Sequence, residues 1–175
     1  MSLSRRHLAT AALAAVAAAA GWLVYGRTFG RTDTPEPAPQ VDYLLLDGQK
    51  LSTAQLKGQV VLVNFWATSC AACVAEMPEL MATHQKYRGQ GYQTVAVSMA
   101  YDPPASVAHF AETRKLPFGV AIDNTGNIAK GFGDVKLTPT SFLINKRGEI
   151  VQRYVGKPDF RALHMLVEQL LAEQA

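Results

Sequence analysis

The chain has 175 residues, about half of them apolar and 18% charged, which suits one globular domain plus a short extra segment. The formal net charge is +3, but four arginines in the first 31 residues, a stretch without Asp or Glu, account for all of the excess. The remainder has 13 basic and 14 acidic residues and therefore does not have the charge of a nucleic-acid-binding domain.

Residues 1–31 are predicted to be an N-terminal export signal or membrane anchor. Arg5 and Arg6 precede an uncharged stretch, Leu8 to Tyr25, and Arg27 follows it. Eighteen helical residues span about 27 Å, which is just enough to cross the hydrocarbon core of a bilayer. The stretch has no polar face, so a soluble helix is not favoured.

Two fates of this segment remain open. Small residues at Ala18 to Ala20 could form a signal-peptide cleavage site, which would release a soluble protein. The apolar run continues past that site to Trp22 and Tyr25, and such aromatic residues suit a membrane interface, so we favour an uncleaved anchor. The arginine pair also resembles a twin-arginine export signal, and the export route stays open.

Residues 32–40 are predicted to be a stiff linker, because alternate prolines at positions 35, 37 and 39 keep a chain extended and prevent a helix. The folded domain is then expected to occupy residues 41–175.

Within residues 41–175, apolar runs separated by turn residues predict strands and helices in alternation. The continuous apolar run at 60–66 is typical of a central strand buried on both faces. The expected elements are, in chain order, strands at 41–46 and 60–66, a helix at 71–88, a strand at 94–98, a helix at 103–115, a strand at 118–122, a short helix at 127–132, a hairpin of strands at 140–144 and 149–154, and a helix at 160–172.

This order predicts the fold class. Alternating strands and helices give a parallel sheet with helices on its faces, and the closing hairpin adds antiparallel strands. The last helix has apolar residues at helical spacing, as expected for a helix lying against a sheet. The chain is therefore predicted to be an α/β sandwich with a mixed central sheet.

Cys70 and Cys73 are the only cysteines, and they have C-x-x-C spacing. No other cysteine can pair with them in a structural disulfide, and two are too few for a Cys₄ zinc site. The histidines at 84, 109 and 164 are isolated, with no His-x₃₋₅-His pair. We therefore expect a redox pair with no metal and no cofactor.

The position of the pair defines its chemistry. It follows a buried strand and opens a helix, whose unpaired N–H groups and dipole stabilise a thiolate at Cys70. Cys73 lies one turn further and is placed to attack a mixed disulfide formed at Cys70. We expect Cys70 to be the nucleophile and Cys73 the resolving thiol.

The segment from Val63 to Leu80 resembles the signature of the TlpA/ResA-type thioredoxin-like proteins, which are membrane-tethered disulfide reductases of the bacterial cell exterior. The resemblance includes the Asp47–Gly58 region and the Thr138–Ile144 run. It implies a thioredoxin-like three-layer sandwich with a central strand–helix insertion, and the elements expected over 94–115 are compatible with that insertion.

The resemblance also implies roles for four further residues. Pro139 matches a cis-proline opposite the active site, which would present the backbone of Thr138 to an extended client chain. Glu76 matches an acidic residue that tunes the cysteines and takes up protons, and partial burial would raise its pKa. Trp66 precedes the active-site loop and is expected beside the disulfide as part of the substrate site, with a purely structural role in the core as the alternative.

Two features depart from the family pattern. Ser69 stands where the family usually has Trp, and Ala71–Ala72 between the cysteines has no proline. The dipeptide of a C-x-x-C site strongly affects its reduction potential, so these departures leave the redox poise and the preferred client undetermined.

The expected function is reduction of disulfides in client proteins at the periplasmic face of the inner membrane. Clients would be apocytochrome c cysteines or copper-delivery proteins for oxidase assembly, and a membrane electron carrier would restore the dithiol. A thiol oxidase or isomerase could use the same two cysteines. A copper-binding chaperone, the third alternative, needs a further soft ligand, for which Met77 and Met99 are candidates.

Overall fold

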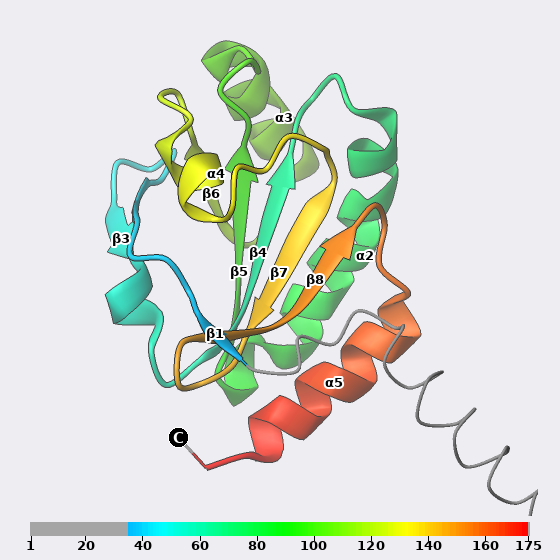
Figure 1. Ribbon diagram of the computed structural model, residues 1–175. Helices are drawn as coiled ribbons and strands as arrows, with labels where there is room; N and C mark the ends of the chain where they lie inside the picture. Colours follow the sequence, from blue (N-terminus) through cyan, green and yellow to red (C-terminus); the bar gives the residue numbers. More distant parts are fainter. Residues whose placement is uncertain (1–34, 175) are drawn as a thin grey trace, which may run out of the picture. The chain divides into compact units, whose positions relative to one another are not determined.

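The computed structural model describes residues 35–174, and the predicted N-terminal signal or anchor lies outside them. Within the described residues, no helix combines the length and apolarity that a membrane crossing requires. The elements, drawn in Figure 1, are β1 (Glu36–Pro37), β2 (Asp42–Leu44), β3 (Lys50–Ser52), the 3₁₀ helix η1 (Thr53–Leu56), β4 (Val60–Trp66), α2 (Ala71–Tyr87), the 3₁₀ helix η2 (Arg88–Gln90), β5 (Tyr92–Ser98), α3 (Pro104–Arg114), β6 (Gly119–Ile122), α4 (Asn127–Gly131), β7 (Thr140–Ile144), β8 (Glu149–Val155) and α5 (Phe160–Ala172).

The central sheet has six strands in the order β1-β8-β7-β4-β5-β6. β4, β5 and β6 are parallel, whereas β7 and β8 form an antiparallel hairpin that joins the sheet beside β4. β4 is the middle of this arrangement, and all seven of its residues are buried. The mixed sheet and thioredoxin-like sandwich expected from the sequence are confirmed.

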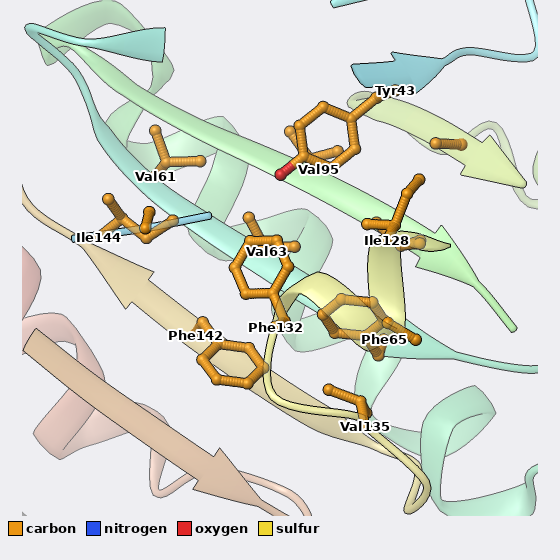
Figure 2. Packing of buried hydrophobic residues seen from close by; sticks show 14 of the residues in the cluster. Tyr43, Val61, Val63, Phe65, Val95, Ile128, Phe132, Val135, Phe142 and Ile144 are labelled. Atoms are coloured by element: carbon orange, nitrogen blue, oxygen red, sulfur yellow. The ribbon is translucent and has the colours of Figure 1, made fainter. Parts of the chain in front are cut away.

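Two apolar cores cover the two faces of the sheet. One contains alternate β4 residues, Val61, Val63 and Phe65, together with residues of α4 and the β2–β3 region. Figure 2 shows the Phe65, Phe132 and Phe142 rings of this core gathered against the sheet, with centroids 5.0 to 5.9 Å apart. The other core contains the opposite β4 residues and the buried sides of α2, α3 and α5.

The N-terminal boundary of the domain differs from the sequence-based expectation. Residues 35–40, predicted to be linker, pack on the sheet: β1 pairs with β8, and Ala38 is buried. Proline is tolerated in this position because an edge strand leaves one side of its backbone unpaired, and the Ala38 N–H still donates to Gly148 O at 2.9 Å.

The chain direction brings the active-site segments together at one end of the central strands, the carboxyl end of β4. We call this end the active-site edge of the sheet. α2 begins at the carboxyl end of β4, with Cys70 as its N-cap residue. β7 runs antiparallel to β4 and starts at Thr140, which is paired with Phe65, so residue 139 lies at the same edge as the residues that follow β4. The cysteine pair and the cis-proline loop are therefore neighbours, although about 70 residues separate them.

Packing of α5 on the sheet is expected to contribute to the stability of the domain. Leu163 is fully buried in the core between α2, α3 and α5, whereas Met165, on the same helix, is 62% exposed. We expect Leu163→Ala to lower the free energy of unfolding by about 2–5 kcal/mol, because it removes buried methyl groups and leaves a cavity.

Urea denaturation of the purified full-length chain measures this effect. Met165→Ala is the control and should change the free energy of unfolding by less than about 0.5 kcal/mol. Equal losses for the two variants would show that α5 does not contribute to the core in this way.

Candidate active site

The two cysteines form a disulfide, and their surroundings are unequal. The Cα atoms of Cys70 and Cys73 are 5.3 Å apart. Cys70 is half-buried, and its sulfur accepts a hydrogen bond from the Cys73 N–H at 3.2 Å, as an N-cap side chain does. Cys73 is fully buried among apolar residues of α2 and the sheet. A client can therefore reach Cys70 but not Cys73.

A buried carboxyl lies one helical turn beyond the pair. The Glu76 side chain is fully buried, and residues three apart on a helix are neighbours, so Glu76 lies next to Cys73. Desolvation of the charged form raises the pKa of Glu76 to about 7, while a hydrogen bond from Asn64 and the charge of Lys157 act in the opposite direction. This carboxyl can hold or release a proton near neutral pH.

The carboxyl is held in place from the central strand. The Asn64 side-chain amide donates to Glu76 Oε1 at 2.9 Å and to the Ser141 hydroxyl at 3.0 Å. Asn64 and Ser141 are paired residues of β4 and β7, and both are fully buried. Glu76 Oε2 is buried and has no hydrogen-bond partner among the described residues, which favours a protonated carboxyl.

The cis-proline loop completes the sheet edge. The peptide bond between Thr138 and Pro139 is cis, as expected from the sequence. Pro139 is buried and Thr138 is half-buried. Within residues 35–174, neither the N–H nor the C=O of Thr138 takes part in a backbone hydrogen bond, so both are available to a chain that pairs with this loop.

Trp66 has the core position that was one of the two roles expected from the sequence. Trp66 packs in the same core as both cysteines and against the Phe110 ring, at a centroid distance of 5.1 Å. Its side chain is fully buried, so it cannot touch a client in this form of the protein. Trp66 supports the active-site loop from inside, because its position in the run 60–66 directs it toward the helical face of the sheet.

Three polar residues at the site, Asn64, Ser141 and Asp102, were not predicted from the sequence. Asn64 had a visible signal, since it is the one polar residue in the apolar run 60–66. Ser141 lies in another apolar strand and gave a weaker signal of the same kind. Asp102, whose carboxylate accepts from the Thr68 N–H at 2.7 Å and from its hydroxyl at 2.5 Å, had none, because its partner is 34 residues away.

The candidate soft ligands for copper are separated by the sheet. Met77 belongs to the core that contains Cys73, whereas Met99 belongs to the core on the opposite face. Met99 therefore cannot join the cysteines in one binding site, and the two methionines cannot act together there. Across residues 35–174, His, Cys, Asp and Glu form no group of three that could hold a metal ion.

Comparisons with known proteins agree with this geometry. The Redoxin family model matches residues 34–166. The thiol-disulfide oxidoreductase ResA of Bacillus cereus is 35% identical over 142 residues, which cover 79% of this chain and 81% of the relative. ResA of Halalkalibacterium halodurans is 33% identical over 147 residues, 82% of each chain.

A solved structure described as a candidate thiol:disulfide interchange protein DsbE, from Chlorobium tepidum, is 30% identical. It superposes with a TM-score of 0.73 over 80% of this chain and 99% of that one. These relatives and the fold agree with the pattern of residues 63–80, where the redox pair lies.

The buried Glu76 predicts a pH-dependent stability. Between pH 4.5 and about 7, the unfolded chain has lost the Glu76 proton while the folded chain keeps it. The unfolded state then binds fewer protons, so stability falls as pH rises, by up to about 1.4 kcal/mol per pH unit. Glu76→Gln has no proton to lose at this position. The free energy of unfolding of the variant minus that of the wild type should therefore rise up to about pH 7 and then level off.

Urea unfolding of the oxidised full-length chain at a series of pH values gives the difference curve. Met165→Ala is the control, because it removes an exposed side chain on α5 that carries no titratable group. Its curve should stay much flatter. A Glu76→Gln difference that is constant from pH 4.5 to 7 would contradict the buried, proton-holding carboxyl.

Proposed function

This chain belongs to the Redoxin family and is related to the ResA thiol–disulfide oxidoreductases, and from this we propose that it reduces disulfides of client proteins outside the cytoplasm. It is a thiol–disulfide oxidoreductase, and Cys70 and Cys73 are its redox pair. The observation that carries the proposed direction is the fully buried Glu76 next to Cys73.

The unequal exposure of the cysteines supports the order of steps. The Cys70 thiolate attacks one sulfur of the client disulfide, forms a mixed disulfide and releases the other client sulfur as a thiolate. The Cys73 thiolate then attacks the Cys70 sulfur, releases the second client sulfur and leaves the Cys70–Cys73 disulfide. Two electrons pass from the dithiol to the client. Glu76 is the proposed acid–base partner for the Cys73 proton.

The charges near the cysteines support reduction over oxidation. Strong thiol oxidants have a stabilised reduced form, because nearby positive charge or N–H groups favour the thiolate. Two buried acidic side chains lie near the pair: Glu76, three residues after Cys73 on α2, and Asp102, which is bonded to Thr68, two residues before Cys70. The Asp102 carboxylate, and Glu76 when it is ionised above about pH 7, oppose negative charge on the sulfurs and therefore disfavour the reduced form.

The proposed location and partners depend on the N-terminal segment, which lies outside the described residues. Its arginines and apolar run support export and anchoring at the periplasmic face of the inner membrane. An oxidising exterior forms disulfides by default, so an anchored reductase there would serve proteins that need free thiols. We propose apocytochrome c or copper-delivery proteins as clients and a membrane electron carrier as the reductant.

The reduction potential of the pair tests the direction. The full-length chain is equilibrated with dithiothreitol or glutathione buffers, and the oxidised fraction is followed by thiol labelling. We expect a potential more negative than about −230 mV, the lower end of the glutaredoxin range. A value near −120 mV, that of a strong oxidant such as DsbA, would contradict the reductase.

Cysteine variants test the roles of the two thiols. Cys70→Ser should abolish insulin reduction, because the accessible nucleophile is lost. Cys73→Ser should accumulate mixed disulfides, which can be isolated from a periplasmic fraction to identify clients. Full turnover by Cys73→Ala would disprove the two-cysteine mechanism.

A further inference from the structure

The loop at residues 99–103, between β5 and α3, joins the two halves of the active site; we call it the bridging loop. Two adjacent side chains of this loop point to different partners. Asp102 binds Thr68, which precedes the cysteines, and the Tyr101 hydroxyl lies 3.4 Å from the hydroxyl of Thr138, which precedes the cis-proline. The bridging loop therefore lies beside both segments that a client must contact.

Asp102 fixes the position of the bridging loop. Its side chain is 3% exposed, and its two carboxylate oxygens accept separate hydrogen bonds from Thr68. The Met99 N–H donates to Trp66 O at 3.0 Å, and the Asp102 N–H donates to Met99 O at 2.9 Å. A loop held by these bonds presents the Tyr101 side chain at a defined place.

The Tyr101 side chain is exposed to solvent. It is 60% exposed, and Leu137, the residue before Thr138, is 66% exposed. Exposed large apolar side chains that gather at a functional edge mark an interaction surface, and tyrosine is enriched at the energetic centres of interfaces. Ser69, Ala71 and Ala72, the small residues around Cys70, are also exposed.

All of these exposed side chains are uncharged. The two charged residues nearest to Leu137 in sequence, Lys136 and Asp134, form an ion pair with each other at 3.0 Å. The exposed side chains beside the cis-proline loop and around Cys70 therefore offer apolar area, free backbone groups and no charge of their own. A client segment with an apolar side chain fits it, whereas an acidic or basic side chain would lose hydration without gaining a partner.

We propose that Tyr101 and Leu137 form a specificity site that binds an apolar side chain, aliphatic or aromatic, adjacent to the client's disulfide cysteine. The client segment would extend along the Thr138 backbone, whose N–H and C=O are free, while the apolar side chain packs against the Tyr101 ring. This inference rests on the proposed use of protein disulfides as substrates. It adds which client sequences are preferred.

Two disulfide-linked peptide dimers test the specificity site. In one peptide the residue beside the single cysteine is Leu, and in the other it is Asp. The full-length chain is first reduced, and the dithiol supplies both electrons, so each turnover forms the Cys70–Cys73 disulfide and releases two peptide thiols. Its rates are compared with those for hydroxyethyl disulfide, which has no side chain to recognise.

We expect the wild type to reduce the Leu peptide about tenfold faster than the Asp peptide. Tyr101→Ala should lower the rate with the Leu peptide about fivefold to tenfold and leave the rate with hydroxyethyl disulfide within about twofold. Tyr101→Phe, which keeps the ring, should retain most of the Leu-peptide rate. Met165→Ala removes an equally exposed apolar side chain from α5 and should change none of these rates.

Three results would overturn the proposal. One is an unchanged Leu-peptide rate in Tyr101→Ala. Another is an equal loss with hydroxyethyl disulfide, which would indicate damage to the cysteines. The third is equal wild-type rates for the two peptides. An oxidising potential would refute the proposed reductase without affecting this peptide preference, since exchange in either direction uses the same surface, so the two failures are distinguishable.

Discussion

The burial of one carboxyl group is the constraint on which the site depends. Glu76 lies in the core between α2 and the sheet, next to Cys73, and it keeps one hydrogen bond, from Asn64 on the central strand. A carboxylate in this position has lost most of its hydration, so its neutral form is favoured until the pH approaches 7. The redox pair therefore shares its surroundings with a group that exchanges protons near pH 7.

The sheet topology explains why these groups meet. Parallel and antiparallel neighbours of β4 direct the active-site loop, the bridging loop and the cis-proline loop to one edge. Asn64 and Ser141 continue the polar contacts inward from that edge, while Asp102 fixes its outer side. The result is an accessible Cys70 backed by a buried proton-exchanging group and flanked by an uncharged, apolar client surface.

Local patterns predicted most of the fold and the reactive pair, because buried strands, helix starts and the C-x-x-C spacing are encoded over a few residues. Contacts between segments far apart in the sequence could not be predicted in this way, because no local pattern encodes them. The full burial of Trp66 depends on α3 packing against it, and the Thr68–Asp102 bonds depend on how β5 ends beside β4. The pairing of Glu36–Pro37 with β8 was missed because alternate prolines favour an extended chain whether or not that chain joins a sheet.

The most direct measurement is a titration of the Glu76 side chain itself. Carbon-13 NMR of the full-length oxidised protein, labelled at glutamate carboxyls and assigned with Glu76→Gln, follows the carboxyl shift with pH. The burial of Glu76 beside Cys73 predicts a midpoint of about 7 for its pKa. A midpoint near 4.5, the ordinary value for this group, would show that the carboxyl is hydrated and would contradict its role in the site.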